Sequence, residues 1–186
     1  MLIANNKKEN NIAEYILYMW QIEALIRSCN FNIYELEEAV ISNYGVSGAE
    51  QLEIHNWYKQ LITEMKLQGI KKTGHLNSLK EIISELVMLH NMLVNLFKDE
   101  KYLLLYGQAL PNIDALLAKS GTTKISEIEV CLNGLFGKLS LKIQKKEISE
   151  DTEKAIESFS KLIAFLTAKY HEMKAGKFVL PDTVKN

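Results

Sequence analysis

Apolar residues recur at every third or fourth position along most of this chain, and no other feature of the sequence restricts the fold as strongly. On an α-helix, residues with this spacing lie on one face, so each segment carries an apolar stripe that must be buried against a neighbour. Alternating strand-like runs and internal repeats are absent from the sequence. Only two prolines occur, Pro111 and Pro181, and most glycines fall between the periodic segments. The pattern therefore predicts an all-α fold, a single-domain bundle of about seven helices.

Glycines and helix-capping residues mark where the predicted helices begin and end. The predicted ranges are approximately 11–28, 32–44, 47–68, 76–97, 99–119, 126–146 and 149–174. The strongest apolar stripe lies in 76–97, which we expect to be the central helix. Gly45, Gly69 and Gly121 are expected to stop the helices that precede them, and Pro111 is expected either to kink its helix or to split it.

The predicted domain plan follows from these helices. Residues 1–10 are expected to be a flexible N-terminus, 11–176 to form the helical bundle, and 177–186 to be a flexible C-terminal tail. The chain has 186 residues, of which 47% are apolar and 24% are charged, as in an ordinary globular domain that can bury one core.

Charge and hydropathy disfavour several classes of partner. The 22 lysines and arginines oppose 23 aspartates and glutamates, and both signs are interspersed along the chain, so nucleic acid receives no electrostatic support. No run approaches the roughly 18 apolar residues of a membrane span, and the N-terminus lacks the apolar region of a signal peptide. Cys29 and Cys131 both lie in apolar helical contexts, which is typical of buried free thiols in a reducing compartment. We therefore expect a cytoplasmic protein that binds neither nucleic acid nor membrane.

Four glutamates have a structural explanation. Each falls three residues after an Asn or Ser at a predicted helix start, which is the spacing of a capping box, where the carboxylate accepts a hydrogen bond from an unpaired backbone amide. The pairs are Asn11 with Glu14, Asn32 with Glu35, Ser47 with Glu50, and Ser126 with Glu129. We interpret these glutamates as signals of helix starts.

A short helix, the turn at Gly45 and a second helix also describe a helix-turn-helix DNA-binding motif. The start of the second helix, however, carries Glu50, Gln51 and Glu53, and carboxylates at that position would repel phosphates. DNA binding is therefore disfavoured.

Gly134 and Gly137 lie inside the apolar pattern of 126–146, where each glycine costs roughly 1 kcal/mol of helix stability. This cost indicates a compensating contact at the backbone. We expect close packing against a partner helix at these positions, and a ligand that approaches the backbone is the alternative.

The motifs of common enzyme classes are absent. No Glu-x-x-His pair, which helical bundles use to bind di-iron centres, contains any of the four histidines. The chain also lacks a glycine-rich phosphate loop, a Gly-x-Ser-x-Gly elbow and a Cys-x-x-Cys pair. A nucleophilic role for Cys131 is less favoured than a buried thiol. We therefore predict no catalytic residue, no metal site and no cofactor.

The first predicted helix carries Tyr15, Tyr18 and Trp20, which combine large apolar areas with polar tips. Glu23 and Arg27 have the spacing of an exposed ion pair on one helix face. The aromatic side chains are therefore expected to face the core and the ion pair to face water, although such a helix can also cover a partner.

Three runs of sequence carry a resemblance to a known family. They are NIAEYILYMWQIE at 11–23, EIEVCLNGLFG at 127–137 and QKKEIS at 144–149. The chain resembles, over most of its length, an uncharacterised bacterial family that is catalogued as a domain of unknown function. The resemblance implies a small, helical, cytoplasmic bacterial protein, and it assigns no catalytic residue.

Abundant apolar helical surface without a recognisable chemical site favours a non-catalytic function. We expect interaction with another protein or self-association, as in a homodimer. The alternative is a small-molecule-binding bundle with a pocket between helices. The residues that would bind the ligand there are Tyr18, Trp57, His75, His90 and Asn133. A metal-dependent enzyme is a weaker alternative.

Overall fold

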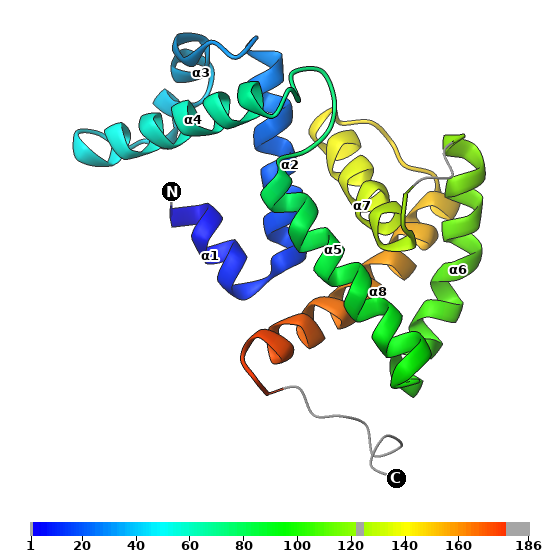
Figure 1. Cartoon of the computed structure of the whole chain (residues 1–186). Coiled ribbons are helices and arrows are strands. Elements are labelled where there is room, and N and C mark those ends of the chain that lie inside the picture. The colour runs from blue at the N-terminus through cyan, green and yellow to red at the C-terminus, as the bar shows by residue number, and fades with distance from the viewer. Residues whose placement is uncertain (1, 122–124, 178–186) are drawn as a thin grey trace. The chain divides into compact units, whose positions relative to one another are not determined.

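The computed structural model describes residues 2–121 and 125–177, and every regular element in these ranges is helical. The α-helices are α1 (Leu2–Asn10), α2 (Ile12–Ser28), α3 (Ile33–Ala39), α4 (Ala49–Leu67), α5 (Asn77–Asn91), α6 (Glu100–Ser120), α7 (Glu127–Ile143) and α8 (Glu150–Lys174) (Figure 1). A 3₁₀-helix, η1 (Ile41–Tyr44), follows α3, and a π-helical turn, η2 (Met92–Leu96), follows α5. The predicted all-α class is confirmed.

These helices form two compact units, Met1–Glu81 and Ile82–Asn186, and the division falls within α5. The expectation of one domain over 11–176 stays a prediction. The predicted flexible tail, apart from Lys177, lies outside the described residues. Within the ranges that the structure describes, no helix is both long and apolar enough to cross a membrane.

Helix α1 covers residues that the sequence predicts to be a flexible N-terminus. Ala4 is buried, the ammonium of Lys7 lies 2.8 Å from the Glu14 carboxylate of α2, and the Lys8 ammonium lies 5.7 Å from the centre of the Tyr15 ring. These contacts with α2 hold the helix. Its apolar residues are confined to its first turn, so they produce no helical periodicity that would have revealed it.

The turns of the first unit agree with two predicted stops and disagree with one predicted start. Gly45 and Gly69 have φ angles of 67° and 70°, the left-handed conformation that favours glycine, as expected. Ser47 does not begin the next helix. Instead α4 starts at Ala49, and Gly48 precedes it with φ 63° and ψ −129°, so no side chain caps this helix.

The core of the first unit forms around α2. Ile16 and Ile26 are fully buried and Trp20 is 3% exposed, so the expected inward position of Trp20 is confirmed. Tyr58 of α4 is also fully buried, and its hydroxyl lies 2.9 Å from that of Tyr44. Buried phenols need such partners because an unpaired hydroxyl in a core is costly.

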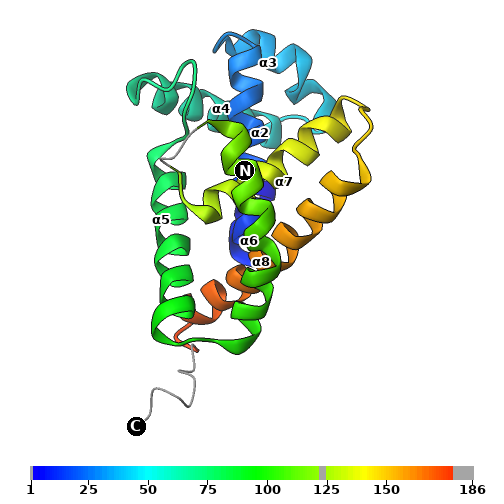
Figure 2. The same ribbon diagram turned by 90° about the vertical axis from the view of Figure 1, so that its right-hand side faces the viewer.

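Three long helices of the second unit pack against one another. Helix α8 contacts both α6 and α7, and α6 also contacts α7 (Figure 2). Helix α6 runs without a break through Pro111, so the proline does not split its helix, and Gly121 ends it with the expected left-handed φ of 64°. Among the fully buried side chains are Leu86, Leu89, Ile113, Leu132, Leu162 and Leu166.

Of the four expected capping boxes, the one at Ser126 is complete. The Ser126 hydroxyl accepts from the Glu129 amide at 3.2 Å, and the Glu129 carboxylate accepts from the Ser126 amide at 2.9 Å. At Asn11 and Asn32 the side chain caps the helix, but the glutamate accepts from the asparagine side chain. The backbone amide of Asn11 instead donates to the Lys7 carbonyl and so continues the hydrogen-bond pattern of α1.

Candidate functional site

A cavity of about 510 Å³ lies between α6, α7 and α8 of the second unit. Helix α7 forms one wall with Val130, Asn133, Gly134, Gly137, Lys138 and Leu141. Leu116 and Ser120 of α6, Ile125, and Thr152 and Ile156 of α8 form the remainder. The α7 residues follow the i, i+3, i+4, i+7 spacing of a helix, so they share one face.

Two glycines on this face have different roles. A Cβ atom on Gly134 would lie 2.8 Å from ring carbons of Phe159 and 3.3 Å from Ile156, so α7 and α8 approach closely there. A Cβ atom on Gly137 would meet nothing within 4 Å. The expected close packing is therefore confirmed at Gly134 and wrong at Gly137, where the missing side chain leaves space in the cavity wall.

Few polar groups line the cavity, and most of them have protein partners. The Lys138 ammonium lies 3.3 Å from the Glu153 carboxylate, the Ser120 hydroxyl donates to the Leu117 carbonyl at 2.8 Å, and the Thr152 hydroxyl lies 2.9 Å from that of Ser149. Asn133 is exposed to the cavity and to solvent, with no protein partner among the described residues. The wall is thus mainly apolar and carries one amide that is available for binding.

A cluster of hydrogen-bonded side chains around His90 joins α5, α6 and α7 in the same unit. The His90 ring is 6% exposed, its Nδ1 lies 2.7 Å from the Tyr102 hydroxyl, and its Nε2 lies 3.2 Å from Glu127. The Tyr106 hydroxyl donates to the other Glu127 oxygen at 3.0 Å. A carboxylate only accepts, so Nε2 carries the proton and Nδ1 of a neutral imidazole accepts from Tyr102.

The ionisation of this cluster favours a neutral, structural network. Burial lowers the pKa of His90 and raises that of Tyr102. Burial and the Glu127 carboxylate raise the pKa of Tyr106 to about 12 and that of the Cys131 thiol to about 12. Both imidazole nitrogens are engaged and the thiol is protonated at neutral pH, so the cluster presents neither a free base nor a nucleophile.

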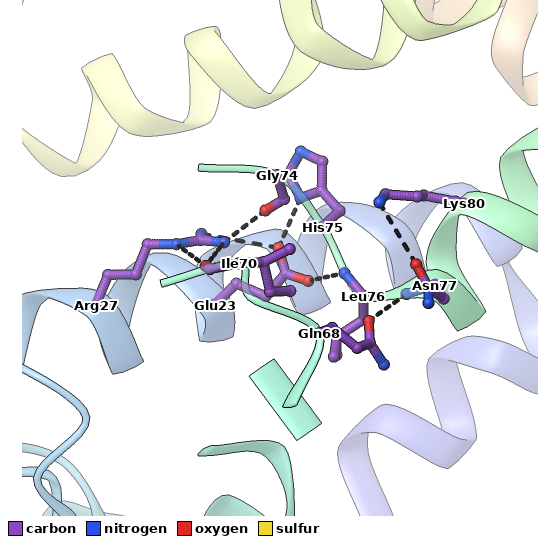
Figure 3. Close-up of polar contacts among 9 residues, drawn as sticks. All are labelled: Glu23, Arg27, Gln68, Ile70, Gly74, His75, Leu76, Asn77 and Lys80. Atoms are coloured by element: carbon purple, nitrogen blue, oxygen red, sulfur yellow. Dashed lines mark hydrogen bonds and ion pairs between the residues drawn. The ribbon is translucent and has the colours of Figure 1, made fainter. Parts of the chain in front are cut away.

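The first unit contains a buried carboxylate that fixes the loop between α4 and α5 (Figure 3). Glu23 of α2 is fully buried, and it accepts from the Leu76 amide at 2.8 Å and bonds His75 Nδ1 at 2.6 Å. Arg27, 3.9 Å from Glu23, donates to the carbonyls of Ile70 and Gly74 in the same loop. The expected exposed ion pair is therefore wrong: the two side chains face the loop and not water.

The five residues predicted to bind a ligand take part in several separate arrangements. Asn133 lines the cavity, whereas His90 of the same unit belongs to the network with Tyr102 and Glu127. In the first unit, Tyr18 is hydrogen-bonded to Tyr44, the half-buried Trp57 ring packs at a steep angle to the Tyr58 ring with 5.0 Å between ring centres, and the His75 ring stacks on Trp20 at 4.3 Å. The signal that would have pointed to the cavity was the Gly134 and Gly137 pair.

The structure also bears on metal binding. Among residues 2–121 and 125–177, no group of three or more His, Cys, Asp or Glu side chains could hold a metal ion. Cys29 and Cys131 are both buried free thiols, as the sequence predicts.

Comparison with known proteins identifies one relationship. The family model described as "Domain of unknown function (DUF4924)" matches residues 1–177. This match confirms the predicted resemblance to an uncharacterised family over most of the chain. No curated protein and no solved structure matches this chain.

Proposed function

The chain belongs to the DUF4924 family, and we propose that it binds a small, largely apolar molecule in the cavity between α6, α7 and α8. The volume of about 510 Å³ lies within the roughly 300–1,000 Å³ of small-molecule pockets. The lining also has the usual composition of such pockets, with apolar walls and a few polar groups that can orient a ligand.

The observation that carries this proposal is the open space at Gly137. A glycine inside a helix weakens the helix by roughly 1 kcal/mol, and no side chain or neighbouring helix among the described residues lies within 4 Å of the position that a Cβ atom on Gly137 would occupy. Close helix packing therefore does not account for this glycine. A bound molecule that lies against the α7 backbone accounts for it.

Thermal unfolding in the presence of neutral apolar compounds tests the proposal. A ligand that binds only the folded state raises the Tm by mass action, so some of these compounds should stabilise the wild-type protein. Gly137→Leu should fill the space and remove this shift. Gly107→Leu is the matched control, because a Cβ atom on Gly107 of α6 also meets nothing within 4 Å and Gly107 does not line the cavity.

Two results would contradict ligand binding at this site. One is a compound collection that produces no shift in the wild-type Tm. The other is a shift that persists in Gly137→Leu with the same dependence on ligand concentration. Circular dichroism of both variants establishes that each retains its helices.

Self-association is a second candidate, and exposed apolar side chains of the second unit favour it. Met88 of α5, Leu96 of η2 and Leu104 of α6 are 53%, 59% and 65% exposed. Contact with a second copy of this chain would remove such surface from water. Light scattering over a range of concentrations should then detect a dimer that is lost when the three residues are replaced by glutamine. A monomer at every concentration would exclude this candidate.

We also propose a cytoplasmic location in a bacterial cell. Two buried free thiols suit a reducing compartment, and the balanced charge suits a freely diffusing protein. Fractionation of cells that express the tagged chain tests this location, and recovery from an extracytoplasmic fraction would contradict it.

A further inference from the structure

Building on the proposed function, we infer that the ligand is uncharged and that it presents one hydrogen-bonding group to the side-chain amide of Asn133. The cavity lies among α6, α7 and α8, and Asn133 is on the same face of α7 as Gly134 and Gly137.

The charged side chain in the described lining of the cavity already has a partner. Among the described residues that line the cavity, Lys138 is the only charged one, and its ammonium pairs with Glu153 at 3.3 Å. A carboxylate ligand would have to compete with Glu153 for this ammonium, and it would lie near the acidic first turn of α8, which contains Glu150 and Asp151. An ammonium ligand would lie near Lys138. A carboxylate ligand would therefore leave water without an unshared counter-ion, and an ammonium ligand would lie beside a like charge. Both arrangements are unfavourable.

The helix ends around the cavity also oppose one another. Ser120 is the last residue of α6, where the helix dipole places partial negative charge. Thr152 is in the first turn of α8, where the dipole places partial positive charge. Neither sign dominates, so the backbone also favours a neutral ligand.

Asn133 is the group that can select the polar end of this ligand. Its amide combines two donors with one acceptor, and it has no protein partner among the described residues. Ser120 and Thr152 already bond within their own helix ends. A hydroxyl, a carbonyl or an amide on an apolar body matches what Asn133 offers.

A series of eight-carbon compounds at pH 7 tests the inference. The probes are 1-octanol, octanoate, octylammonium and 1-fluorooctane, which has nearly the shape of octanol without its hydroxyl proton. Displacement of the neutral dye Nile red measures binding. The wild-type protein should bind octanol about tenfold or more tightly than either ion. It should also bind octanol about two- to tenfold more tightly than 1-fluorooctane, the range that one neutral hydrogen bond supplies.

Asn133→Leu, which keeps a similar shape, should abolish the difference between octanol and 1-fluorooctane. Asn91→Leu makes the same change on an exposed residue of α5 outside the cavity, and it should keep the difference. Equal or tighter binding of either ion, or an octanol preference that survives in Asn133→Leu, overturns the inference and leaves ligand binding intact. If no probe displaces the dye, ligand binding at this cavity and the inference fall together.

Discussion

Gly134 of α7 lies directly against the ring of Phe159 in α8, so that a Cβ atom on the glycine would come within 2.8 Å of two ring carbons. One turn further along α7, Gly137 has no neighbour within 4 Å of the same position. At Gly134 the two helices approach closely, and at Gly137 the open space is part of the cavity wall.

Alanine substitutions at these glycines should have opposite effects. Gly134→Ala should lower the free energy of unfolding by about 1–3 kcal/mol, because the new methyl group displaces the Phe159 ring. Gly137→Ala should raise it by about 0.5–1 kcal/mol, because alanine favours the helix and nothing obstructs it. Urea denaturation measures both values. If Gly137→Ala instead destabilises the protein, the cavity wall at this position has no room for a methyl group in solution.

The His90 network should make stability depend on pH. Burial lowers the pKa of His90 below its usual value of about 6.5, so the unfolded state binds the proton more readily than the folded state. Stability from this site is therefore present above pH 6.5 and decreases as the pH falls below that value. Glu127, Tyr102 and Tyr106 are the titratable groups that face the ring.

His90→Gln isolates this contribution. The wild-type protein should be more stable than the variant at pH 7.5, and the difference in the free energy of unfolding should narrow towards pH 5. Urea titrations at several pH values give this difference directly. A difference that is constant or that widens in acid would mean that His90 accepts its proton inside the fold.

The Glu85 side chain should stabilise the contact between α5 and α8 only when its carboxyl group is ionised, that is, above its pKa. It accepts from the Tyr170 hydroxyl at 2.6 Å and from the Lys174 ammonium at 2.8 Å, and both bonds lower the pKa of Glu85. A carboxyl with a lowered pKa stabilises the fold above its unfolded value of about 4.3, and this stability is lost as the pH falls further.

Glu85→Gln should therefore cost about 0.5–1 kcal/mol at pH 7, since the pair is partly exposed, and less at pH 3. Glu157→Gln is the control, because it removes an exposed pair with Lys161 inside a single helix. Equal losses from the two variants would show that the contact between α5 and α8 contributes no more than a surface pair.

Removal of the buried Glu23 carboxylate should destabilise the first unit strongly. Glu23→Ala leaves the Leu76 amide and His75 without their acceptor, at a cost of about 3 kcal/mol. Glu23→Gln keeps one acceptor oxygen and should cost less. Urea unfolding curves of both Glu23 variants measure the loss in the free energy of unfolding, and Glu81→Ala, at an exposed position, is the control. A Glu23→Ala loss no larger than that of Glu81→Ala would exclude a role for this carboxylate in fixing the loop.

Features that depend on neighbouring residues in the sequence were predictable. The Ser126 and Glu129 capping box and the stops at Gly69 and Gly121 require only three or four consecutive residues. Local backbone preferences decide these features, and tertiary packing reinforces them.

Features that depend on distant contacts were not predictable. Glu23 has the spacing of an ordinary exposed ion pair with Arg27, and its burial depends on Leu76, 53 positions away. The cavity was not predictable for the same reason. The glycine pattern predicts a contact at the backbone, but it does not distinguish Gly134, which packs against Phe159, from Gly137, which faces open space. Helix α1 was not predicted because lysine side chains make its contacts with α2, and it carries no apolar stripe.

The two buried cysteines give each unit its own chemical reporter. Cys29 belongs to the first unit and Cys131 to the second, and burial raises the pKa of Cys131 to about 12. Only a thiolate that is open to water can attack a disulfide reagent and displace its leaving thiolate, so modification proceeds through transient opening of the surrounding helices. Labelling of the unaltered protein, followed by mass spectrometry, therefore reports how often each half of the chain loosens, without an engineered probe.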